Sequence, residues 1–369
     1  MSKKYRIAVV GAGMGGLLAA CMLQRAGHAC TVYEQAPKLA KVGAGINVAP
    51  NSTRIFRALG LEQQMLEAGI QPKLKFSREW DTGELLYTVP VPELRARYGA
   101  PFLAFHRGAL QEVLYSALEP DTVQFGRQLA RLEQTPDHAR LDFADGSSVE
   151  ADIVIGADGV HSRVRESLFG AAPADYHGLV AYRSLITGSG LKPADNTKWW
   201  APDRYVLIYY TTEARDEINL VTGSPQPWTH GDYQPRPASA QDLLDTFRGF
   251  HEEVQEVLRA ATSVTCWPML ERVPFSPWSQ GRAVLLGDAC HPTTPHMGQG
   301  AGMAFEDAVV LARCIDAFGD DLTEAFGRYE KARHARTSRI QHESHENQWT
   351  KKGMDPDWVY GYDALTVPL

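Results

Sequence analysis

The sequence has few cysteines and no arrangement of them that would bind a metal or form a redox pair. Its 369 residues include five cysteines, and none stands in a Cys-x-x-Cys pair or at zinc-ligand spacing. We therefore expect reduced thiols, as in a cytoplasmic protein. Internal repeats and low-complexity segments are also lacking, so the chain is not a repeat array.

An excess of positive charge and a long unbroken apolar run are lacking as well. The net charge of -7 argues against nucleic acid as a main partner. Residues 7–23 carry no charge, but four glycines interrupt them, so a strand, turn and helix explain them better than a signal peptide. No other stretch is long enough to span a bilayer, and we expect no membrane partner. The hydrophobic content of 44% is ordinary for a soluble enzyme.

A glycine pattern near the N-terminus indicates a dinucleotide site. An apolar stretch at residues 6–10 predicts a buried strand, and Gly-x-Gly-x-x-Gly follows it. Gly11 permits the tight turn, Gly13 lets the backbone approach a pyrophosphate, and Gly16 allows helix–strand packing. The helix that follows offers free N–H groups to phosphates. Glu34 ends the next strand, where a carboxylate binds ribose hydroxyls.

Two further strings extend the predicted ligand beyond a small nucleotide. Gly156–Ser162 and Gly287–Pro292 each follow an apolar strand, and they place Asp158 and Asp288 where ligands gather in open α/β sheets. Asp158 alone would also fit a plain Asp-Gly turn. Glycines at residues 298–302 precede a second long helix and permit close backbone approach there. Together the strings predict a large, two-ended dinucleotide such as FAD.

The order of elements predicts an α/β protein. We expect a discontinuous, Rossmann-like FAD-binding domain at residues 1–175 and 265–345. A mostly antiparallel β-sheet, expected to form the substrate domain, is inserted at residues 176–264, where the pattern turns β-rich. C-terminal helices follow, and the aromatic residues of segment 346–369 predict a tail that packs on the core.

At this point the chain resembles the FAD-dependent aromatic hydroxylases of the 4-hydroxybenzoate hydroxylase group. The strings GAGMGG, GADGVHSRVR and GDACHPTTPHMGQG carry the resemblance, which covers nearly all residues. Within the group, YEQAPKLAKVGAGI, KWW and YYTT are most similar to members that act on 6-hydroxynicotinate. The resemblance implies FAD, NADH or NADPH as electron donor, and O2, with hydroxylation through a flavin C4a-hydroperoxide and optional loss of CO2. The sequence shows no second Gly-x-Gly-x-x-Gly for the donor.

The pattern and the resemblance together give the site residues that we expect. The predicted cofactor contacts are Gly11, Gly13, Gly15, Gly16, Glu34, Gln35, Arg107, Leu129, Asp158, Asp288, Pro292, Gly298, Gly300 and Ala301. Tyr209 and His296 are the candidates to hold or deprotonate the substrate hydroxyl. Asn47 cannot act as a base but can hydrogen-bond to substrate or flavin, and Tyr205 completes the predicted substrate contacts.

Three departures separate this pocket from the members that act on 6-hydroxynicotinate. Those members have a histidine at Asn47, a cysteine at Asn196 and a histidine at Tyr205. The scaffold is kept while part of the pocket differs. The expected substrate is a small aromatic or pyridine carboxylate like 6-hydroxynicotinate, and hydroxypicolinate, salicylate or another hydroxybenzoate stays open.

Several further assignments stay open at this stage. Arg204 and Lys198 are both candidates for the substrate carboxylate, and four aromatic residues are candidate apolar walls: Trp199, Trp200, Tyr210 and Trp228. His342 and His345 have helical spacing, but without a third ligand we expect no metal. Rival functions are a flavin-dependent dehydrogenase that does not use oxygen and a nucleotide sensor, and a homodimer is an open alternative to a monomer.

Overall fold

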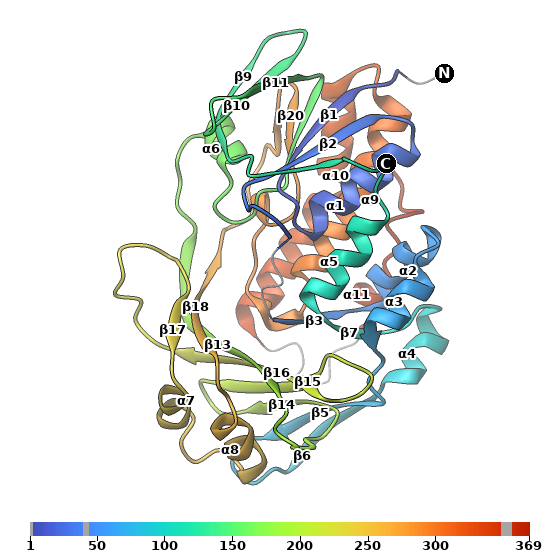
Figure 1. The fold of residues 1–369 in the computed structure, drawn as a ribbon. Helices are drawn as coiled ribbons and strands as arrows, with labels where there is room; N and C mark the ends of the chain where they lie inside the picture. The colour runs from blue at the N-terminus through green and yellow to red at the C-terminus, as the bar shows by residue number, and fades with distance from the viewer. Residues whose placement is uncertain (1–2, 40–43, 348–355) are drawn as a thin grey trace.

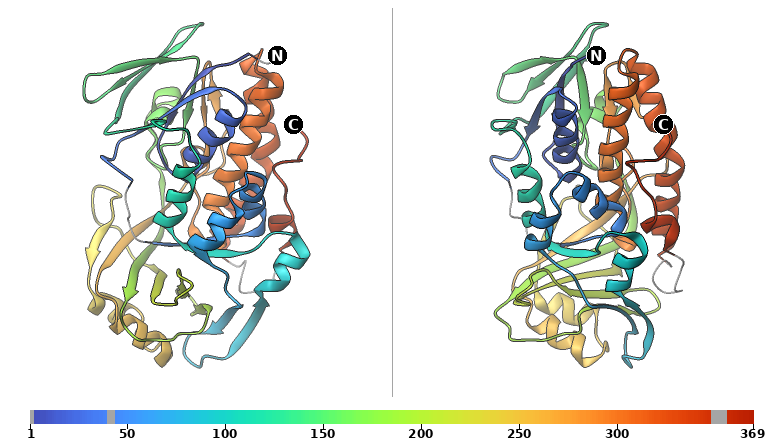
Figure 2. Two further views of the ribbon diagram at one scale, coloured as in Figure 1. Left: turned by 45° about the vertical axis from the view of Figure 1, so that its right-hand side comes forward. Right: turned by 90° about the vertical axis from the view of Figure 1, so that its right-hand side faces the viewer.

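The computed structural model describes residues 3–39, 44–347 and 356–369. Figure 1 shows two stacked parts, a parallel sheet flanked by long helices above and a large sheet below. Figure 2, from two further sides, shows the C-terminal helices running along the upper part. The predicted α/β class is confirmed.

The upper sheet has six strands in the order β19-β20-β12-β1-β2-β8, and β19 alone pairs antiparallel. Their bounds are β1 (Arg6–Val10), β2 (Ala29–Glu34), β8 (Val123–Phe125), β12 (Ile153–Gly156), β19 (Ser279–Gln280) and β20 (Ala283–Leu285). Strands from three distant parts of the chain therefore share one sheet, as a discontinuous Rossmann-like domain requires. The uncharged N-terminal stretch forms β1 and α1 (Met14–Arg25), as predicted.

Long helices cover this sheet. Helix α1 packs on α9 (Gly300–Phe318), and α9 packs on α10 (Leu322–Glu346). The other helices of this half are α2 (Pro50–Ala58), α3 (Glu62–Ala68), α4 (Val91–Tyr98), α5 (Arg107–Ser116), α6 (Arg163–Phe169) and α11 (Asp357–Tyr360). Val359 and Tyr360 of α11 are buried in one cluster with Leu94 and Ile340.

Two small sheets complete this half. One has the order β11-β10-β9, with β9 (Leu129–Gln134), β10 (Ala139–Phe143) and β11 (Ser148–Ala151). The other has the order β3-β7-β4, with β3 (Gly45–Val48), β4 (Gly69–Ile70) and β7 (Leu103–His106). Strand β3 matters for the site because it carries Asn47 to the boundary between the two halves.

The lower sheet has eight strands in the order β17-β18-β13-β16-β15-β14-β5-β6. Their bounds are β5 (Leu74–Glu79), β6 (Leu85–Pro90), β13 (Asp175–Thr187), β14 (Asn196–Trp200), β15 (Tyr205–Tyr210), β16 (Glu217–Pro225), β17 (Arg236–Ala238) and β18 (Val264–Glu271). Pairing is antiparallel except between β14 and β5. The sheet reaches beyond the expected segment 176–264, because β5, β6 and most of β18 also belong to it. The domain boundaries themselves stay a prediction.

Alternation along the strands gives the lower sheet two distinct faces. Trp199, Val206 and Ile208 point outward and are buried in a cluster with Leu243 and Phe247. The latter two belong to α7 (Ala240–Thr246) and to its end, and α8 (Glu252–Arg259) lies beside them (Figure 1). The other face looks toward the upper half of the molecule.

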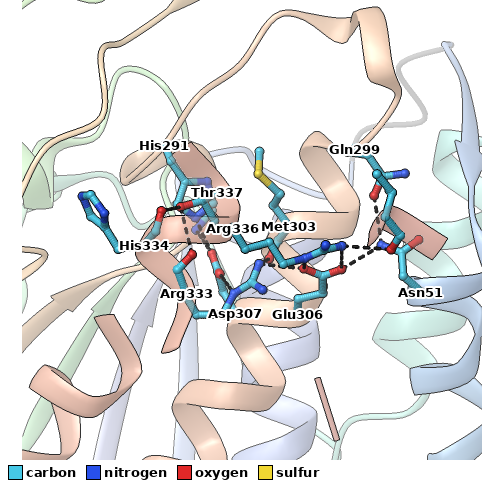
Figure 3. A network of polar contacts seen from close by, with 12 residues as sticks. Asn51, His291, Gln299, Met303, Glu306, Asp307, Arg333, His334, Arg336 and Thr337 are labelled. Carbon is cyan, nitrogen blue, oxygen red and sulfur yellow. Dashed lines mark hydrogen bonds and ion pairs between the residues drawn. The ribbon is translucent and has the colours of Figure 1, made fainter. Parts of the chain in front are cut away.

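A buried network of charged side chains joins the helices of the upper half (Figure 3). Arg333 of α10 contacts both Glu306 and Asp307 of α9 at 2.8 Å, and all three side chains are fully buried. Arg336 forms a further pair with Glu306 at 2.8 Å. His291 lies 2.6 Å from Asp307, so the network also anchors the loop after β20.

No helix in the described ranges combines the length and the apolar character that crossing a bilayer needs.

Candidate active site

A cavity of about 430 Å³ lies between the two halves, within the size range of ligand sites. At one end it is lined by the glycine turn before α1 and by the start of α9. At the other end it is lined by the inward face of the eight-stranded sheet. The cavity therefore brings both predicted parts of the site, cofactor and substrate, into one space.

The glycine turn has the shape that a pyrophosphate needs. At Gly11, with φ of +105°, a Cβ would lie 2.5 Å from the carbonyl oxygen of Ala157, and at Gly16 one would lie 2.1 Å from the Gly11 oxygen. At Gly13 the nearest atom to a Cβ is 3.9 Å away, so this position is open. Helix α1 has no side-chain cap, which leaves its first N–H groups for a ligand.

Gly15 serves packing as well as the cavity. A Cβ there would lie 2.7 Å from Leu286 Cδ2 and 2.9 Å from Ala304 Cβ, so glycine allows α1 to approach α9. Glu34 lies beside the glycine turn, and its carboxylate accepts hydrogen bonds from the N–H groups of Ala12 and Ala36, both at 2.8 Å. These bonds fix the carboxylate and leave each oxygen a second acceptor site for a ribose hydroxyl.

The start of α9 forms the second backbone approach. Asp288, Gly298, Gly300 and Ala301 all line the cavity, and no side chain caps the helix. Arg107, the first residue of α5, lines it as well. These groups offer a long dinucleotide further contacts in the same cavity as the first turn. The described residues therefore fit FAD.

Asp158 does not line the cavity, and its predicted contact with the cofactor stays a prediction. Its carboxylate accepts hydrogen bonds from Ser162 Oγ at 2.5 Å and from the N–H groups of Arg163 at 2.7 Å and Val164 at 3.1 Å. The side chain thus caps the start of α6. Six other predicted contacts do not line the cavity either: Gly11, Gly16 and Glu34 lie in or beside the glycine turn, Gln35 is exposed, and Leu129 and Pro292 are buried elsewhere.

Strand register places the substrate-end residues on one face. Tyr209 of β15 lies opposite Asn196 of β14 and Asn219 of β16. Asn196 Nδ2 lies 3.4 Å from Asn47 Oδ1 of β3. Gly45 is required at the start of β3, because a Cβ there would lie 2.7 Å from the Tyr209 hydroxyl. The structure thus brings Asn47 and Tyr209 together at the cavity wall.

Tyr209 and Tyr205 are neutral in this environment. Both line the cavity, and burial raises the pKa of each hydroxyl well above its usual value, although the positive charge of Arg183 opposes the shift. A hydroxyl that stays protonated donates a hydrogen bond and does not act as a base. Of the two roles left open for Tyr209, the geometry supports holding the substrate hydroxyl.

His296 is held as a hydrogen-bond acceptor. Its Nδ1 donates to the Ser344 carbonyl at 2.8 Å, so Nε2 carries a lone pair. Nε2 is buried without a partner, and the ring packs against Tyr205 with centroids 5.5 Å apart. Burial and the charge of Lys198 lower the pKa of His296 to about 3, which keeps the ring neutral. A buried, unpartnered acceptor at the cavity fits a substrate hydroxyl.

Cations gather on the same inward face. Lys198, Lys75 and Arg183 all line the cavity. Arg204, the other candidate for the substrate carboxylate, instead binds the adjacent Asp203 and the Thr246 carbonyl and does not line it. Sequence reasoning missed Lys75 and Arg183, because their place depends on the pairing of β5 and β13 in the larger sheet.

None of the four aromatic residues expected as apolar walls lines the cavity. Trp199 stacks on His251, with ring centroids 5.1 Å apart, and the Tyr210 hydroxyl donates to the Pro193 carbonyl at 3.1 Å. Both residues face the α7–α8 layer, and neither Trp200 nor Trp228 lines the cavity. The apolar lining comes from other residues, which include Ile46, Phe76, Val89, Leu94, Phe102, Leu207 and Met297.

A histidine–glutamate cluster lies behind His296. Nδ1 of His177 and Nδ1 of His345 each lie 2.9 Å from the same Glu271 oxygen. Among the described residues this is the only group of metal-ligand type, and sequence reasoning missed its partners because they come from β13 and β18. Hydrogen bonds account for all three side chains. The absence of a metal stays a prediction.

Comparison with known proteins gives close relatives over the full length. Residues 4–344 match the FAD binding domain family. The whole chain is 44% identical to 6-hydroxynicotinate 3-monooxygenase of Bordetella bronchiseptica and covers 98% of it. It is 43% identical to the enzyme of that name from Pseudomonas fluorescens, again covering 98%. Over 99% of the chain it is 37% identical to 3-amino-4-hydroxybenzoate 2-monooxygenase of Streptomyces cremeus, of which 97% is covered.

Solved structures show the same fold. HpxO of Klebsiella pneumoniae, complexed with FAD and uric acid, superposes with a TM-score of 0.84 at 29% identity. That superposition covers 95% of this chain and 89% of HpxO. A salicylate hydroxylase in complex with its substrate superposes with a TM-score of 0.81 at 23% identity over 99% of both chains, which compares the fold alone.

Proposed function

The chain belongs to the FAD binding domain family, within the FAD-dependent aromatic hydroxylases, and we propose that it hydroxylates a hydroxylated pyridine or benzene carboxylic acid. It is an FAD-dependent monooxygenase that uses O2 and NAD(P)H. The proposed first substrate is 6-hydroxynicotinate, the compound named in its 43–44% identical relatives. One observation carries the proposal: a single cavity joins the glycine turns that fit FAD to Asn47, Tyr209 and His296.

FAD, when bound, supplies the oxygen activation and takes the electrons from NAD(P)H. We propose that this chain holds it through Gly13 and the start of α1 at the pyrophosphate, and through Glu34 at the ribose. Arg107, Asp288 and residues 298–301 are the further proposed contacts. Ala157 and Gly159 line the cavity beside them, which supports a backbone contribution where the Asp158 side chain was expected.

The substrate end supports control of one proton. The attacked ring must be electron-rich, and a ring hydroxyl that gives up its proton supplies that density. We propose that His296 Nε2 accepts a hydrogen bond from this hydroxyl while its own ring stays neutral, and that the Tyr209 hydroxyl donates a hydrogen bond to the same oxygen. Asn47, held by Asn196, orients the ring and transfers no proton.

Exclusion of water is the other task of the pocket. Phe102, Met297 and Leu207 give the substrate end an apolar wall, and Tyr360 of α11 lines it from the C-terminal segment. When water is excluded from the pocket, the activated oxygen is transferred to the substrate and is not lost as hydrogen peroxide. Burial of Tyr205, Tyr209 and His296, each 3–5% exposed, supports such a site.

A second substrate class is favoured by one local feature. Asn47 and Asn196 stand as a hydrogen-bonded pair where the members acting on 6-hydroxynicotinate have histidine and cysteine. Amides offer both donors and acceptors, so the pair accommodates a different ring substituent. Hydroxypicolinate, salicylate and another hydroxybenzoate are therefore the alternatives. The monooxygenase relatives argue against the dehydrogenase and sensor alternatives.

The discriminating experiment is a panel of hydroxypyridine and hydroxybenzoate acids. We expect one acid, with 6-hydroxynicotinate as the first candidate, to give product equal to the NADH consumed. If 6-hydroxynicotinate only speeds NADH oxidation and releases peroxide, it is not the substrate. If no acid in the panel gives product, the proposed substrate class is wrong.

The cellular setting is proposed on separate grounds. The five cysteines are free and buried, which supports a reducing cytoplasm. A net charge of -7 supports a protein without a nucleic-acid partner. Sedimentation of the FAD-loaded protein decides between a monomer and a homodimer.

A further inference from the structure

We propose that Lys75 and Lys198 together form the subsite for the carboxylate of the substrate, and that this pair selects acids over their neutral analogues. The inference rests on the proposed function only in placing the substrate in this cavity. It names a binding partner for the carboxylate of the substrate, because Asn47, Tyr209 and His296 provide none.

Strand pairing puts the two lysines on one face of the sheet. Strands β5 and β14 run parallel, and Lys75 is the register partner of Asn196, two residues before Lys198. Residues two apart on a strand point to the same side. Both lysines line the cavity, with Tyr205 and Tyr209 of the next strand on the same side. The pair therefore faces the same space as the groups proposed to hold the substrate hydroxyl.

Neither ammonium group has an anionic or hydrogen-bonding partner within the described residues. Lys198 is 8% exposed, and its Nζ lies 3.9 Å from the centroid of the Trp200 ring and 4.2 Å from that of Tyr205. Lys75 Nζ lies 4.3 Å from the centroid of the Phe102 ring. Ring faces attract a cation but do not neutralise it. Two neighbouring lysines with only ring contacts form a site that an anion would complete.

The described part of the chain places no acid beside the lysine pair. Among the described residues, Asp288 is the only acidic one that lines the cavity, and it lies beside Gly300 at the start of α9, with Oδ1 3.9 Å from where a Gly300 Cβ would be. The other lining cations are Arg107 and Arg183, and Arg107 is a proposed FAD contact. Since no described residue supplies the anion for the lysine pair, we assign that place to the ligand.

The environment of the pair predicts how binding depends on pH. Burial lowers the pKa of Lys75 to about 8, and burial together with the charge of Lys75 lowers that of Lys198 to about 7. A carboxylate favours the protonated lysines, so above pH 7 binding must take up a proton. Affinity for an acid should then fall as the pH rises through 7 to 8, by at most about tenfold per pH unit for each lysine.

Other groups around the pair do not titrate in that window. His296 stays neutral, because its pKa is lowered to about 3. Tyr205 also stays neutral, because its pKa is raised well above its usual value. Burial lowers the pKa of Arg183, but a guanidinium starts from a pKa far above 8 and stays charged.

The test is equilibrium binding to the oxidised, FAD-loaded protein without NADH. The probes are 6-hydroxynicotinate and its neutral analogue 6-hydroxynicotinamide, followed by the change in flavin absorbance. In Lys198→Met and in Lys75→Met, we expect the Kd of the acid to rise at least about thirtyfold, as for loss of one partner of a buried charge pair. The Kd of the amide should change by no more than about twofold.

A matched control uses a lysine that is exposed and does not line the cavity. Lys192→Met should leave both dissociation constants unchanged. Unchanged FAD content and melting temperature would show that the pocket variants fold. If Lys198→Met does not fold, Lys198→Gln replaces it, and the pH dependence of acid binding to the wild-type protein tests the pair without any variant.

Three results would overturn the inference. These are equal losses for acid and amide in the variants, an acid affinity that does not change in them, and wild-type acid binding that is independent of pH between 6 and 9. Because binding needs no turnover, the two proposals fail separately. Lysine-dependent acid binding without hydroxylation of any acid would sink the proposed function alone, whereas efficient hydroxylation without lysine dependence would sink the subsite alone.

Discussion

Two adjacent tyrosines of strand β15 point to opposite faces of the sheet. Tyr209 faces the cavity, whereas Tyr210 faces the α7–α8 layer and donates to the Pro193 carbonyl. The contrast isolates what a phenol hydroxyl contributes at the site. If the hydroxyl matters because it faces the cavity, its removal from Tyr209 should impair catalysis and its removal from Tyr210 should not.

Replacing Tyr209 by phenylalanine should impair the reaction and spare the fold. We expect Tyr209→Phe to lower kcat at least about a hundredfold, because a positioned proton donor typically contributes that much. FAD content and melting temperature should stay near those of the wild type. The measurements are the rate of product formation at saturating acid and NADH, which gives kcat, and the product formed per NADH consumed.

Tyr210→Phe is the matched control. It removes a buried hydrogen bond and should cost about 1 kcal/mol of stability while leaving product per NADH unchanged. Equal effects of the two variants on product formation would contradict the role given to Tyr209.

Residue types could be predicted better than residue directions. The family resemblance named Tyr209 and His296, and both line the cavity. Asp158 was expected at the cofactor from its place after a strand; its carboxylate accepts hydrogen bonds from N–H groups at the start of α6, and its contact with the cofactor stays a prediction. Whether an acidic side chain accepts hydrogen bonds from a nearby helix start or from a cofactor depends on the local path of the backbone, and a sequence pattern does not specify that path.

At the scale of elements, a substitution in the glycine turn before α1 should weaken cofactor binding without affecting the stability of the fold. Gly13→Ala would place a methyl group toward the cavity, since the nearest protein atom to that Cβ is 3.9 Å away. The backbone there, at φ of -65°, is allowed for alanine. We expect apoprotein of unchanged melting temperature with an FAD Kd raised at least about tenfold by steric conflict with the pyrophosphate. Titration of apoprotein with FAD measures it.

Gly327 in α10 gives the control for the same substitution. It is exposed, and a Cβ there would meet nothing within 4 Å. Gly327→Ala should stabilise the protein by about 0.5–1 kcal/mol through better helix propensity, with no change in FAD affinity. If Gly13→Ala binds FAD as tightly as Gly327→Ala does, the pyrophosphate does not lie at this turn.

Local elements were predictable, and distant pairings were not. Strand β1, helix α1 and strand β2 could be predicted from a first apolar run, the glycine spacing and a second apolar run, because all three signals lie close together in the sequence. The parallel pairing of β5 with β14 joins residues about 120 positions apart, and no local pattern specifies it. That pairing is what brings Lys75 into the pocket.

At the scale of the whole molecule, one buried ion network connects the helices that carry the cofactor half. Arg333 contacts Glu306 and Asp307, and His291 extends the network to the loop after β20 (Figure 3). Arg333→Met would leave two buried carboxylates with less compensation. We expect a loss of about 3–5 kcal/mol in the free energy of unfolding, measured by urea denaturation of the apoprotein.

Arg339→Met on the same helix provides the comparison. Its guanidinium is half exposed and lies 3.9 Å from Glu343, so its removal should cost less than about 1 kcal/mol. Similar losses for the two arginines would contradict a network that depends on burial.

The central claim is that FAD chemistry and the substrate-end residues act on one aromatic acid in one cavity. The most direct measurement is a single turnover of the NADH-reduced holoenzyme with isotopically labelled O2 and 6-hydroxynicotinate, or the best acid from the panel. The account predicts one labelled oxygen atom in the hydroxylated product for each NADH consumed. Consumption of NADH with all labelled oxygen recovered as peroxide, for every acid tested, would contradict it.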